Sequence, residues 1–329
     1  MKWLITGGCG FIGRNLVKNL VEEDGHFIRI IDNLSVGTRK DLSGVCDFVE
    51  TDSSSLDSTA QIKTELIVAD ILDADLTVKA AEGIDVIIHL AANTGVAPSV
   101  ENPRLDCENN VYGTLNLLEA ARINQTSRFV FASSGAPVGE CEPPIHEEIP
   151  PHPVSPYGAS KLSGEGYCSA YFHTFGIDTV CLRFGNVYGP LSSHKDSVVA
   201  KFIKNIMEGK PLEIYGDGTQ TRDFIFTDDL IQAIRLSVQT DNIGGEIFQI
   251  ATSTETTVSE LAEKLIETYK KIQKDQNIQI IHSSRRKGDV KRNFSDTSKA
   301  SRILNWQAEI SLADGLRKTI KWFGEFEKD

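Results

Sequence analysis

One stretch near the start of the chain decides the fold: Thr6-Gly7-Gly8-Cys9-Gly10-Phe11-Ile12-Gly13. Its outer glycines recur every third residue, and it joins a predicted strand, Trp3–Thr6, to a predicted helix, Phe11–Glu23. Glycines at this spacing permit a tight turn, a close approach of the backbone to a phosphate, and packing of the helix on the strand without a Cβ. The free N–H groups at the start of the helix then face a pyrophosphate.

A carboxylate follows at the end of the next predicted strand, Phe27–Asp32. An acidic side chain at this place accepts hydrogen bonds from the adenosine ribose and repels a 2′-phosphate. The strand, the glycine turn, the helix and Asp32 together predict a bound dinucleotide, and Asp32 favours NAD over NADP. Arg39 and Lys40 lie nearby in the sequence and are suited to a 2′-phosphate, so NADP remains the alternative.

The composition is that of a globular protein with a sizeable core. The chain has 329 residues, of which 40% are hydrophobic and 24% are charged, which are ordinary values for this class. Its net charge of −12 argues against nucleic acid as a partner, because nucleic-acid-binding surfaces are basic. Neither a run of ~18 apolar residues nor a signal peptide is present, so we expect no membrane association. Six scattered cysteines without a CxxC pair predict reduced thiols in the cytoplasm and no metal site.

In the first half, short β-branched runs alternate with helical stretches, a pattern typical of a doubly wound parallel sheet. Further strands are predicted at Glu65–Asp70, Asp85–Ala91, Arg128–Ser133 and Asp178–Arg183, and further helices at Arg104–Asn124, Pro156–Phe175 and Leu312–Glu327. Residues 51–64 are polar and are interpreted as a surface insertion. We expect an α/β fold with a Rossmann-type, NAD-binding domain over residues 1–180. A smaller α/β substrate-binding domain is expected over residues 181–329, with some segments returning to the first domain.

A tyrosine and a lysine stand four residues apart in Tyr157-Gly158-Ala159-Ser160-Lys161, on one face of a predicted helix. A phenol is a weak base near neutral pH. A neighbouring ammonium and a positive nicotinamide ring are expected to lower the tyrosine pKa. Ser133 and Ser134 end a predicted strand, and strand ends in a parallel sheet lie at the edge where ligands bind. These residues form a candidate catalytic group; helix packing with a solvated lysine is the alternative.

Five segments together resemble the extended short-chain dehydrogenase/reductase family, and within it the NAD-dependent sugar-nucleotide epimerases and dehydratases. They are the glycine turn, His89-Leu90-Ala91-Ala92, the serine pair, Tyr157-x-x-x-Lys161 and Arg183-Phe184-Gly185-Asn186-Val187-Tyr188-Gly189-Pro190. The resemblance extends to about Trp306. It implies that Tyr157 is the catalytic base and acid, that Lys161 holds the nicotinamide ribose and lowers the tyrosine pKa, and that Ser134 binds the reacting sugar hydroxyl.

The predicted cofactor site draws on both kinds of inference. Asp70, at the end of a predicted strand, is placed beside the adenine edge, with a helix N-cap as the alternative. The resemblance puts Asn110 beside the cofactor. The whole predicted set is Gly7, Gly10, Phe11, Ile12, Gly13, Asp32, Asn33, Asp70, Ile71, Leu90, Ala91, Ala92, Asn110, Tyr157 and Lys161.

Members of this branch differ in what happens to the 4-keto sugar. Dehydratases carry Thr-Asp-Glu after the serine strand and UDP-glucuronate decarboxylases carry a glutamate, since these reactions need a further acid or base. Here the matching positions are Gly135 and Ala136, and neither moves a proton. The absence of a cysteine at Gly135 also speaks against the epimerase-reductases. We therefore expect C4 epimerisation, as in the UDP-hexose 4-epimerases. A 4,6-dehydratase, a decarboxylase and a non-catalytic NAD-sensing protein remain alternatives.

The substrate residues implied by the resemblance come mainly from the second half of the chain. Arg222 and Arg286 would grip the diphosphate, because a guanidinium meets phosphate with two parallel donors. Tyr215 would stack on the base, and Asp289 would hold the nucleotide ribose. Asn293 stands where a bulky tyrosine would exclude an N-acetyl group. The whole predicted set is Thr94, Ser134, Asn186, Val199, Tyr215, Arg222, Arg286, Asp289 and Asn293.

The resemblance also implies the protein's partners. Homodimers formed through the helices around residues 104–124 and 156–175 are common in the family. We therefore expect a homodimer, and a nucleotide sugar as the small-molecule partner: a UDP-hexose of the UDP-glucose, UDP-N-acetylglucosamine or UDP-glucuronate type.

Overall fold

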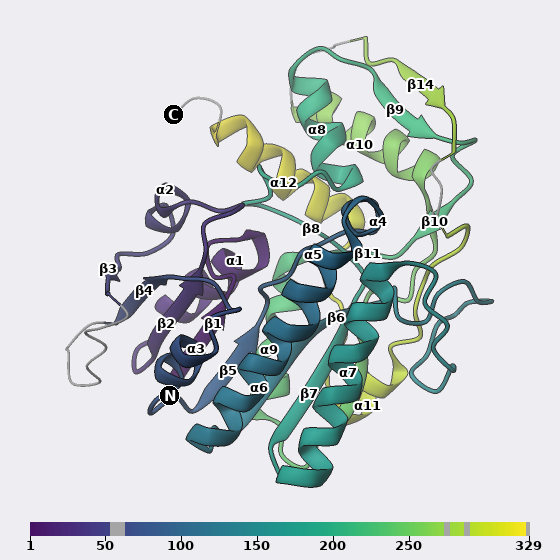
Figure 1. Cartoon of the computed structure of the whole chain (residues 1–329). Coiled ribbons are helices and arrows are strands. Elements are labelled where there is room, and N and C mark those ends of the chain that lie inside the picture. The colour runs from purple at the N-terminus through teal and green to yellow at the C-terminus, as the bar shows by residue number, and fades with distance from the viewer. Residues whose placement is uncertain (53–62, 273–276, 286–289, 327–329) are drawn as a thin grey trace. The chain divides into compact units, whose positions relative to one another are not determined.

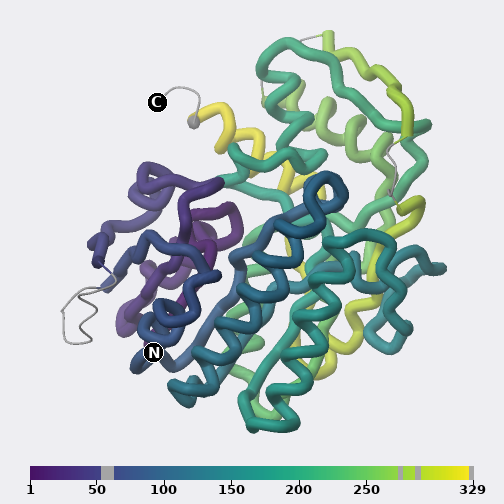
Figure 2. Tube along the Cα trace, viewed as in Figure 1, coloured from purple at the N-terminus to yellow at the C-terminus, as the bar shows by residue number. Residues whose placement is uncertain are grey.

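The computed structural model describes residues 1–52, 63–272, 277–285 and 290–326 (Figure 2). The chain divides into two compact units. The first unit holds Met1–Gly139, Pro150–Arg183 and Ala233–Phe248, and the second holds Glu140–Ile149, Phe184–Gln232 and Gln249–Asp329. Two segments therefore do not follow the single boundary expected near residue 180: Glu140–Ile149 belongs to the second unit, and Ala233–Phe248 belongs to the first. The assignment of NAD to one unit and of the sugar nucleotide to the other stays a prediction.

An eight-stranded sheet organises the first unit (Figure 1). Its strands are β1 (Lys2–Thr6), β2 (Phe27–Asp32), β3 (Val49–Glu50), β4 (Thr64–Val68), β5 (Val86–His89), β6 (Arg128–Ser134), β7 (Asp178–Phe184) and β12 (Glu246–Ile250). They lie in the order β12-β7-β6-β5-β1-β2-β4-β3. The pairs of β1 with β2 and β5, of β2 with β4, of β4 with β3, and of β5 with β6 are parallel. The chain moves outward from β1 in both directions, so the predicted doubly wound α/β fold is confirmed.

The register of the central strands brings the predicted cofactor residues to one edge. Thr6, the last residue of β1, is paired with Ile31 of β2 and with His89 of β5. The glycine turn, Asp32 and Leu90 follow directly after these three positions. They therefore emerge side by side where the strand order reverses, which is the place where open α/β sheets bind ligands.

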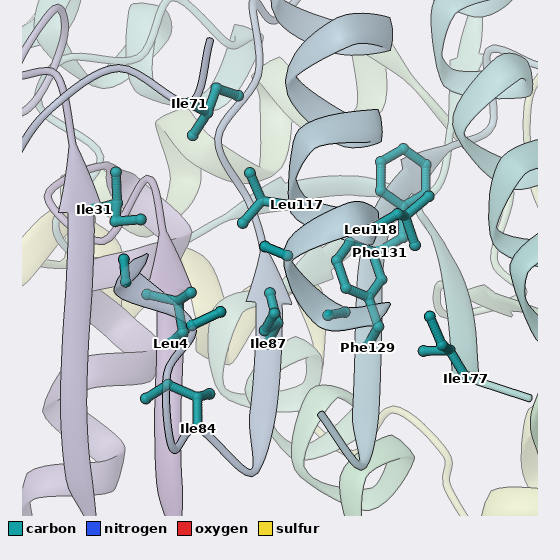
Figure 3. Packing of buried hydrophobic residues seen from close by; sticks show 14 of the residues in the cluster. Leu4, Ile31, Ile71, Ile84, Ile87, Leu117, Leu118, Phe129, Phe131 and Ile177 are labelled. Carbon is teal, nitrogen blue, oxygen red and sulfur yellow. The ribbon is translucent and has the colours of Figure 1, made fainter. Parts of the chain in front are cut away.

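Helices cover the sheet of the first unit. They are α1 (Phe11–Val21), α2 (Arg39–Ser43), α3 (Ala74–Ala80), α4 (Val96–Glu101), α5 (Pro103–Cys107), a π-helical turn (Glu108–Tyr112), α6 (Gly113–Asn124) and α7 (Pro156–Phe175). In addition, α9 (Thr227–Gln239) contains the boundary between the units at Ala233. Leu4, Ile87 and Phe129 are in register on β1, β5 and β6 and share a buried cluster with Leu117 and Leu118 of α6 (Figure 3). This packing fixes α6, and with it the π-helical turn, on the sheet.

Several predicted elements differ from the structure by one or two residues at an end; the strand predicted at Asp85–Ala91, for example, is β5, Val86–His89. The region around β4 differs more. The strand predicted at Glu65–Asp70 is β4, which ends at Val68, and Asp70 lies in the turn that follows. The insertion predicted over residues 51–64 is wrong at its end, because Thr64 is buried in β4. The short strand β3 precedes it and was not predicted, since both of its residues are exposed. Residues 53–62 lie outside the described part.

The single helix predicted at Arg104–Asn124 is wrong as one element. It is divided into α5, the π-helical turn and α6. Asn102 starts it by accepting a hydrogen bond from the N–H of Leu105 at 3.1 Å, as an N-cap residue does. Such π-helical turns are often associated with functional sites, and this one carries Asn110.

In its described residues, the second unit is built from short strands and four helices of its own. The strands are β8 (Asn186–Tyr188), β9 (Leu212–Tyr215), β10 (Thr221–Arg222), β11 (Phe224–Phe226), β13 (Thr256–Thr257) and β14 (Ile280–Ser283). The helices are α8 (Val198–Met207), α10 (Val258–Ile272), α11 (Ser298–Leu304) and α12 (Leu312–Phe326). Phe202, Leu261 and Leu316 join α8, α10 and α12 in one buried cluster. The final helix begins where predicted, at Leu312.

Among the described residues, no helix is both long and apolar enough to cross a membrane. All six cysteines are free thiols, as expected from their scattered positions.

Glycines of α7 give a test of how closely this helix packs. A Cβ on Gly158 would lie 2.6 Å from the carbonyl oxygen of Ala136, whereas a Cβ on Gly166 would meet nothing within 4 Å. Gly158→Ala should therefore lower the free energy of unfolding by about 1–3 kcal/mol, because backbone must move. Gly166→Ala should raise it by about 0.5–1 kcal/mol through its higher helix propensity. Urea unfolding of both variants measures the difference, and equal changes would contradict the packing of α7 on Ala136.

Candidate active site

The glycine turn has the backbone geometry that a pyrophosphate requires. Gly7 has a φ of +71°, in the left-handed region, and a Cβ on it would lie 2.9 Å from backbone after β5. A Cβ on Gly13 would lie 2.6 Å from the Cα of Gly8, so α1 rests directly on the turn. Helix α1 starts at Phe11 after Gly10, with no side-chain cap and no acidic residue in its first turn. These uncapped N–H groups fit a dinucleotide phosphate.

Asp32 is buried at the end of β2 and ties this strand to the glycine turn. Its carboxylate accepts hydrogen bonds from the N–H of Cys9 at 2.8 Å and of Leu34 at 2.9 Å. Burial raises the pKa of Asp32, and these two hydrogen bonds oppose the rise. Each carboxylate oxygen keeps a further lone pair. Asp32 can therefore hold the turn and still accept ribose hydroxyls, so these residues fit NAD.

The cations considered for NADP are arranged differently from what a 2′-phosphate site needs. Arg39 donates two hydrogen bonds to the exposed carboxylate of Glu50, at 2.6 and 2.8 Å. Lys40 is exposed on α2. The pairing of Arg39 with Glu50 offers a carboxylate where a phosphate would have to bind, which weighs against NADP.

Asp70 belongs to a small network beyond β4. The side-chain amide of Asn33 donates to Asp70 at 3.0 Å, and the N–H of Leu72 donates to its other oxygen at 3.0 Å. The N-cap of α3 is Asp73, which accepts a hydrogen bond from the N–H of Leu76. The alternative interpretation of Asp70 as a helix N-cap is therefore wrong. Its contact with the adenine stays a prediction.

The loop after β5 is held by Asn110 of the π-helical turn. Asn110 accepts a hydrogen bond from the N–H of Asn93 at 2.8 Å, and its amide nitrogen lies 2.9 Å from the Asn93 carbonyl. The loop is also held at Ala91, whose N–H donates to the Thr6 hydroxyl at 3.1 Å. Asn110 is 1% exposed. It thus shapes the loop that contains Leu90, Ala91 and Ala92, while a direct contact with NAD stays a prediction.

The two serines at the end of β6 have different partners. The Ser133 hydroxyl donates to the buried Glu165 at 2.5 Å. The Ser134 hydroxyl accepts a hydrogen bond from the N–H of Ala136 at 3.2 Å and is hydrogen-bonded to the Tyr157 side chain. The structure therefore brings Ser134, not Ser133, together with Tyr157.

Lys161 is 3% exposed and is held from the sheet. Its ammonium donates to the carbonyl of Ala132 at 2.8 Å and lies 4.8 Å from the ring centroid of Phe131. Burial lowers the pKa of Lys161 to about 8, and the carboxylates of Asp106 and Glu165 oppose this effect. Lys161 is thus the third member of the predicted catalytic group, and it lies one turn after Tyr157 on α7.

The expected direction of the Tyr157 pKa is wrong for the protein alone. Burial raises the pKa of Tyr157 to about 12, and the hydrogen bond with Ser134 only partly opposes the rise. The Lys161 ammonium is directed to the Ala132 carbonyl and the Phe131 ring, so it does not offset the burial. A further positive charge is needed to make Tyr157 a base, and the nicotinamide ring is one that fits.

Two buried carboxylates beside this group were missed in the sequence. Glu165 forms a pair of hydrogen bonds with Arg183, at 2.8 and 2.7 Å. Asp106 lies 3.0 Å from the Asn110 amide nitrogen. Each is four residues from a predicted site residue along a helix, Asp106 from Asn110 and Glu165 from Lys161. This spacing was the available signal, because such residues are neighbours on a helix surface.

The predicted residues of the second unit are partly brought together. The N–H of Asn293 donates to the Thr221 hydroxyl at 3.2 Å, which places Asn293 beside Arg222. The Arg222 guanidinium donates to the carbonyls of Thr221 and Val290 at 2.6 and 2.9 Å. Its engagement with the backbone fixes the side chain. A diphosphate contact stays a prediction.

Other predicted substrate residues have varied surroundings. The Tyr215 hydroxyl donates to Glu213 at 2.7 Å, and the ammonium of Lys201 lies 5.0 Å from the Tyr215 ring centroid. Asn186 and Thr94 are exposed, whereas the Val199 side chain is buried in the cluster around α8. Arg286 and Asp289 lie outside the described residues.

Comparisons with known proteins agree with this geometry. The sequence profile of the NAD dependent epimerase/dehydratase family matches residues 3–251. A UDP-glucose 4-epimerase from Mycolicibacterium smegmatis is 36% identical over 329 residues, covering 98% of each chain. The crystal structure of a UDP-glucose 4-epimerase from Thermotoga maritima, with UDP-glucose, matches with a TM-score of 0.87 and 32% identity, over 99% of this chain and 100% of that one. A dTDP-glucose 4,6-dehydratase from Streptomyces venezuelae matches with a TM-score of 0.87 and 30% identity, over 100% and 98%.

The glycine turn and Asp32 fit the cofactor after which the matching family is named, so the prediction of NAD is confirmed. The relatives include both epimerases and dehydratases that act on nucleotide sugars. The activity is accordingly that of an NAD-dependent nucleotide-sugar epimerase or dehydratase. The fold, the site and the matching profile lead to one conclusion: the chain belongs to the NAD dependent epimerase/dehydratase family.

Proposed function

We propose that the protein catalyses the C4 epimerisation of a UDP-hexose. The observation that carries this proposal is the identity of the two residues after Ser134. Gly135 and Ala136 follow the strand end, and the Ala136 carbonyl lies against Gly158, next to Tyr157. Neither residue has a side chain that transfers a proton. A dehydratase or decarboxylase needs a further acid or base at this place, whereas an epimerase needs none.

The proposed roles follow from the contacts of each side chain. Tyr157 takes the proton of the sugar 4-hydroxyl and later returns it, with Ser134 hydrogen-bonded both to Tyr157 and to the sugar. Lys161 holds the nicotinamide ribose from its fixed position at the Ala132 carbonyl. Bound NAD would supply the acceptor for the hydride of C4 and its return to the opposite face of the sugar.

A panel of UDP-glucose, UDP-N-acetylglucosamine and UDP-glucuronate tests the reaction and the substrate together. The purified protein should convert at least one of them to its C4 epimer, followed by NMR. Loss of water or of CO₂ would instead place the protein with the dehydratases or decarboxylases.

Asn293→Tyr should reduce the conversion of the N-acetylated sugar about tenfold or more relative to UDP-glucose, because the larger side chain excludes the acetamido group.

The role of Tyr157 is tested by removing one oxygen atom. Tyr157→Phe should bind NAD as the unmodified protein does, but turn over about 10²–10⁴-fold more slowly, which is the usual contribution of general acid–base catalysis. Tyr167→Phe is the matched control, since Tyr167 is an exposed tyrosine on the same helix. Equal rates for the two variants would remove Tyr157 from the mechanism.

We also propose that two copies associate through α4 to α7 of the first unit. Figure 1 shows α5 and α6 end to end, with α7 beside them. Six large apolar or aromatic side chains of these helices and the π-helical turn are exposed: Val100, Leu105, Tyr112, Ile123, Tyr167 and Phe175. Large apolar side chains exposed on neighbouring helices are typical of an interface, and a second copy of this chain is the partner that the family resemblance implies.

Charge placed on this face should prevent association. Leu105→Glu combined with Phe175→Glu should convert the dimer to a monomer, measured by size-exclusion chromatography with light scattering, because each carboxylate would be buried against apolar surface. Val49→Glu, at an exposed edge strand of the same unit, should leave the mass unchanged. A monomer before any substitution would contradict the proposed interface.

A further inference from the structure

Lys161 is flanked by two buried carboxylates, and they differ in how fully they are paired. Glu165, one turn further along α7, accepts two hydrogen bonds from Arg183 and one from Ser133. Both Glu165 and Arg183 are 3% exposed or less. The negative charge of Glu165 is therefore balanced by Arg183, which leaves the charge of Lys161 to be balanced by another group.

Asp106 is the other carboxylate. It is 1% exposed, and one of its oxygens lies 3.0 Å from the amide nitrogen of Asn110. Its second oxygen, Oδ2, is buried without a hydrogen-bond partner among the residues that the structure describes. A buried carboxylate with an unsatisfied oxygen is costly. Burial raises the pKa of Asp106, and Ser160 and the charge of Lys161 oppose this rise.

Asp106 is joined to the catalytic helix through Asn110. The Asn110 amide nitrogen that faces Asp106 also lies 3.1 Å from the hydroxyl of Ser160, the residue before Lys161. The Ser160 hydroxyl in turn donates to the carbonyl of Tyr157 at 3.0 Å. A chain of short polar contacts thus runs from Asp106 on α5 to the Tyr157–Lys161 turn of α7.

We propose that Asp106 is the counter-charge of Lys161 and a positioning residue for the Tyr157–Lys161 pair. The cluster then holds two cations, Lys161 and Arg183, and two anions, Asp106 and Glu165, so that four buried charges balance. The proposal rests on the catalytic roles given above to Tyr157 and Lys161. It does not depend on which nucleotide sugar is the substrate.

The negative charge of Asp106 determines the direction in which it shifts the pKa values of Lys161 and Tyr157. A carboxylate favours the protonated form of any group near it. Asp106 accordingly raises the pKa of Lys161 against the effect of burial, and it adds to the rise in the pKa of Tyr157 caused by burial. Removing the charge should lower both pKa values.

The other groups around Lys161 cannot replace Asp106. Glu165 on α7 is already paired with Arg183 of β7. The thiol of Cys181 is neutral, because its hydrogen bond with Cys168 and its burial raise its pKa. His89 at the end of β5 is uncharged, since burial lowers its pKa to about 3. Asp106 is therefore the group whose charge sets the pH range of the site.

The test replaces Asp106 with asparagine, which keeps the shape and removes the charge. In the NAD-bound enzyme, both limbs of the pH–rate profile should move to lower pH by about 1 unit. The limb due to Tyr157 shifts because the phenolate forms more readily, and the limb due to Lys161 shifts because the ammonium is lost sooner. Asp106→Glu should restore the original profile. Glu101→Gln, which removes an exposed charge at the end of α4, should shift neither limb.

A lower rate at every pH with both limbs unchanged would overturn the proposal and leave Asp106 with a structural role alone.

The pH dependence of NAD affinity, followed by tryptophan fluorescence, is the second measurement. The loss of affinity above the pKa of Lys161 should begin about 1 unit lower in Asp106→Asn. This readout separates the two proposals, because it responds to Lys161 even if no UDP-hexose is epimerised. Asp106→Ser removes the same charge and replaces Asp106→Asn if the asparagine variant does not fold.

Discussion

The hydrogen bond from the N–H of Cys9 to Asp32, 2.8 Å long, is the contact on which the cofactor site depends. It joins the glycine turn after β1 to the end of β2, so the two elements that a dinucleotide must span are fixed by one side chain. The bond is buried and charge-assisted, which makes it stronger than an ordinary amide hydrogen bond. Replacing Asp32 would leave the N–H of Cys9 without its partner and would also remove the carboxylate that is predicted to accept the ribose hydroxyls. One carboxylate thus supports the turn and is the predicted basis of the preference for NAD.

The parallel sheet extends this arrangement from the cofactor to the chemistry. Four of its strands each lead to one component at the carboxyl edge: the glycine turn after β1, Asp32 on β2, the loop held by Asn110 after β5, and Ser134 on β6. Helix α7 then supplies Tyr157 and Lys161, and its close contact with the Ala136 carbonyl at Gly158 sets how near they come. This close packing buries charged side chains. The ion pair of Glu165 with Arg183, and the proposed pairing of Lys161 with Asp106, offset the cost of that burial.

Local patterns predicted the parts of the site that are locally determined. The glycine spacing predicted the turn, and the bounds of β2 and α7 were obtained to the residue, because each is flanked by clear turn or capping signals such as Ser155. The π-helical turn and the partners of Ser133 were not predicted, and the direction in which the Tyr157 pKa shifts was predicted wrongly. Each depends on burial by segments distant in the sequence. The start of β4 was missed for a related reason: Thr64 is polar and follows a polar stretch, yet it is buried by its neighbours in the sheet. Arg286 and Asp289 lie outside the described residues, so they remain predictions from the sequence.

Asn110 has a consequence for how this enzyme can change over evolution. Its single side chain holds the loop after β5 through Asn93 and contacts Ser160 of the catalytic helix. A substitution there would disturb the loop after β5 and the first turns of α7 at the same time, so these two segments cannot change independently through this position. Asn293, which is proposed to admit or exclude an N-acetyl group, belongs to the second unit, whereas Asn110 belongs to the first. Under the proposed roles, a change of sugar through Asn293 would leave the contacts of Asn110 intact.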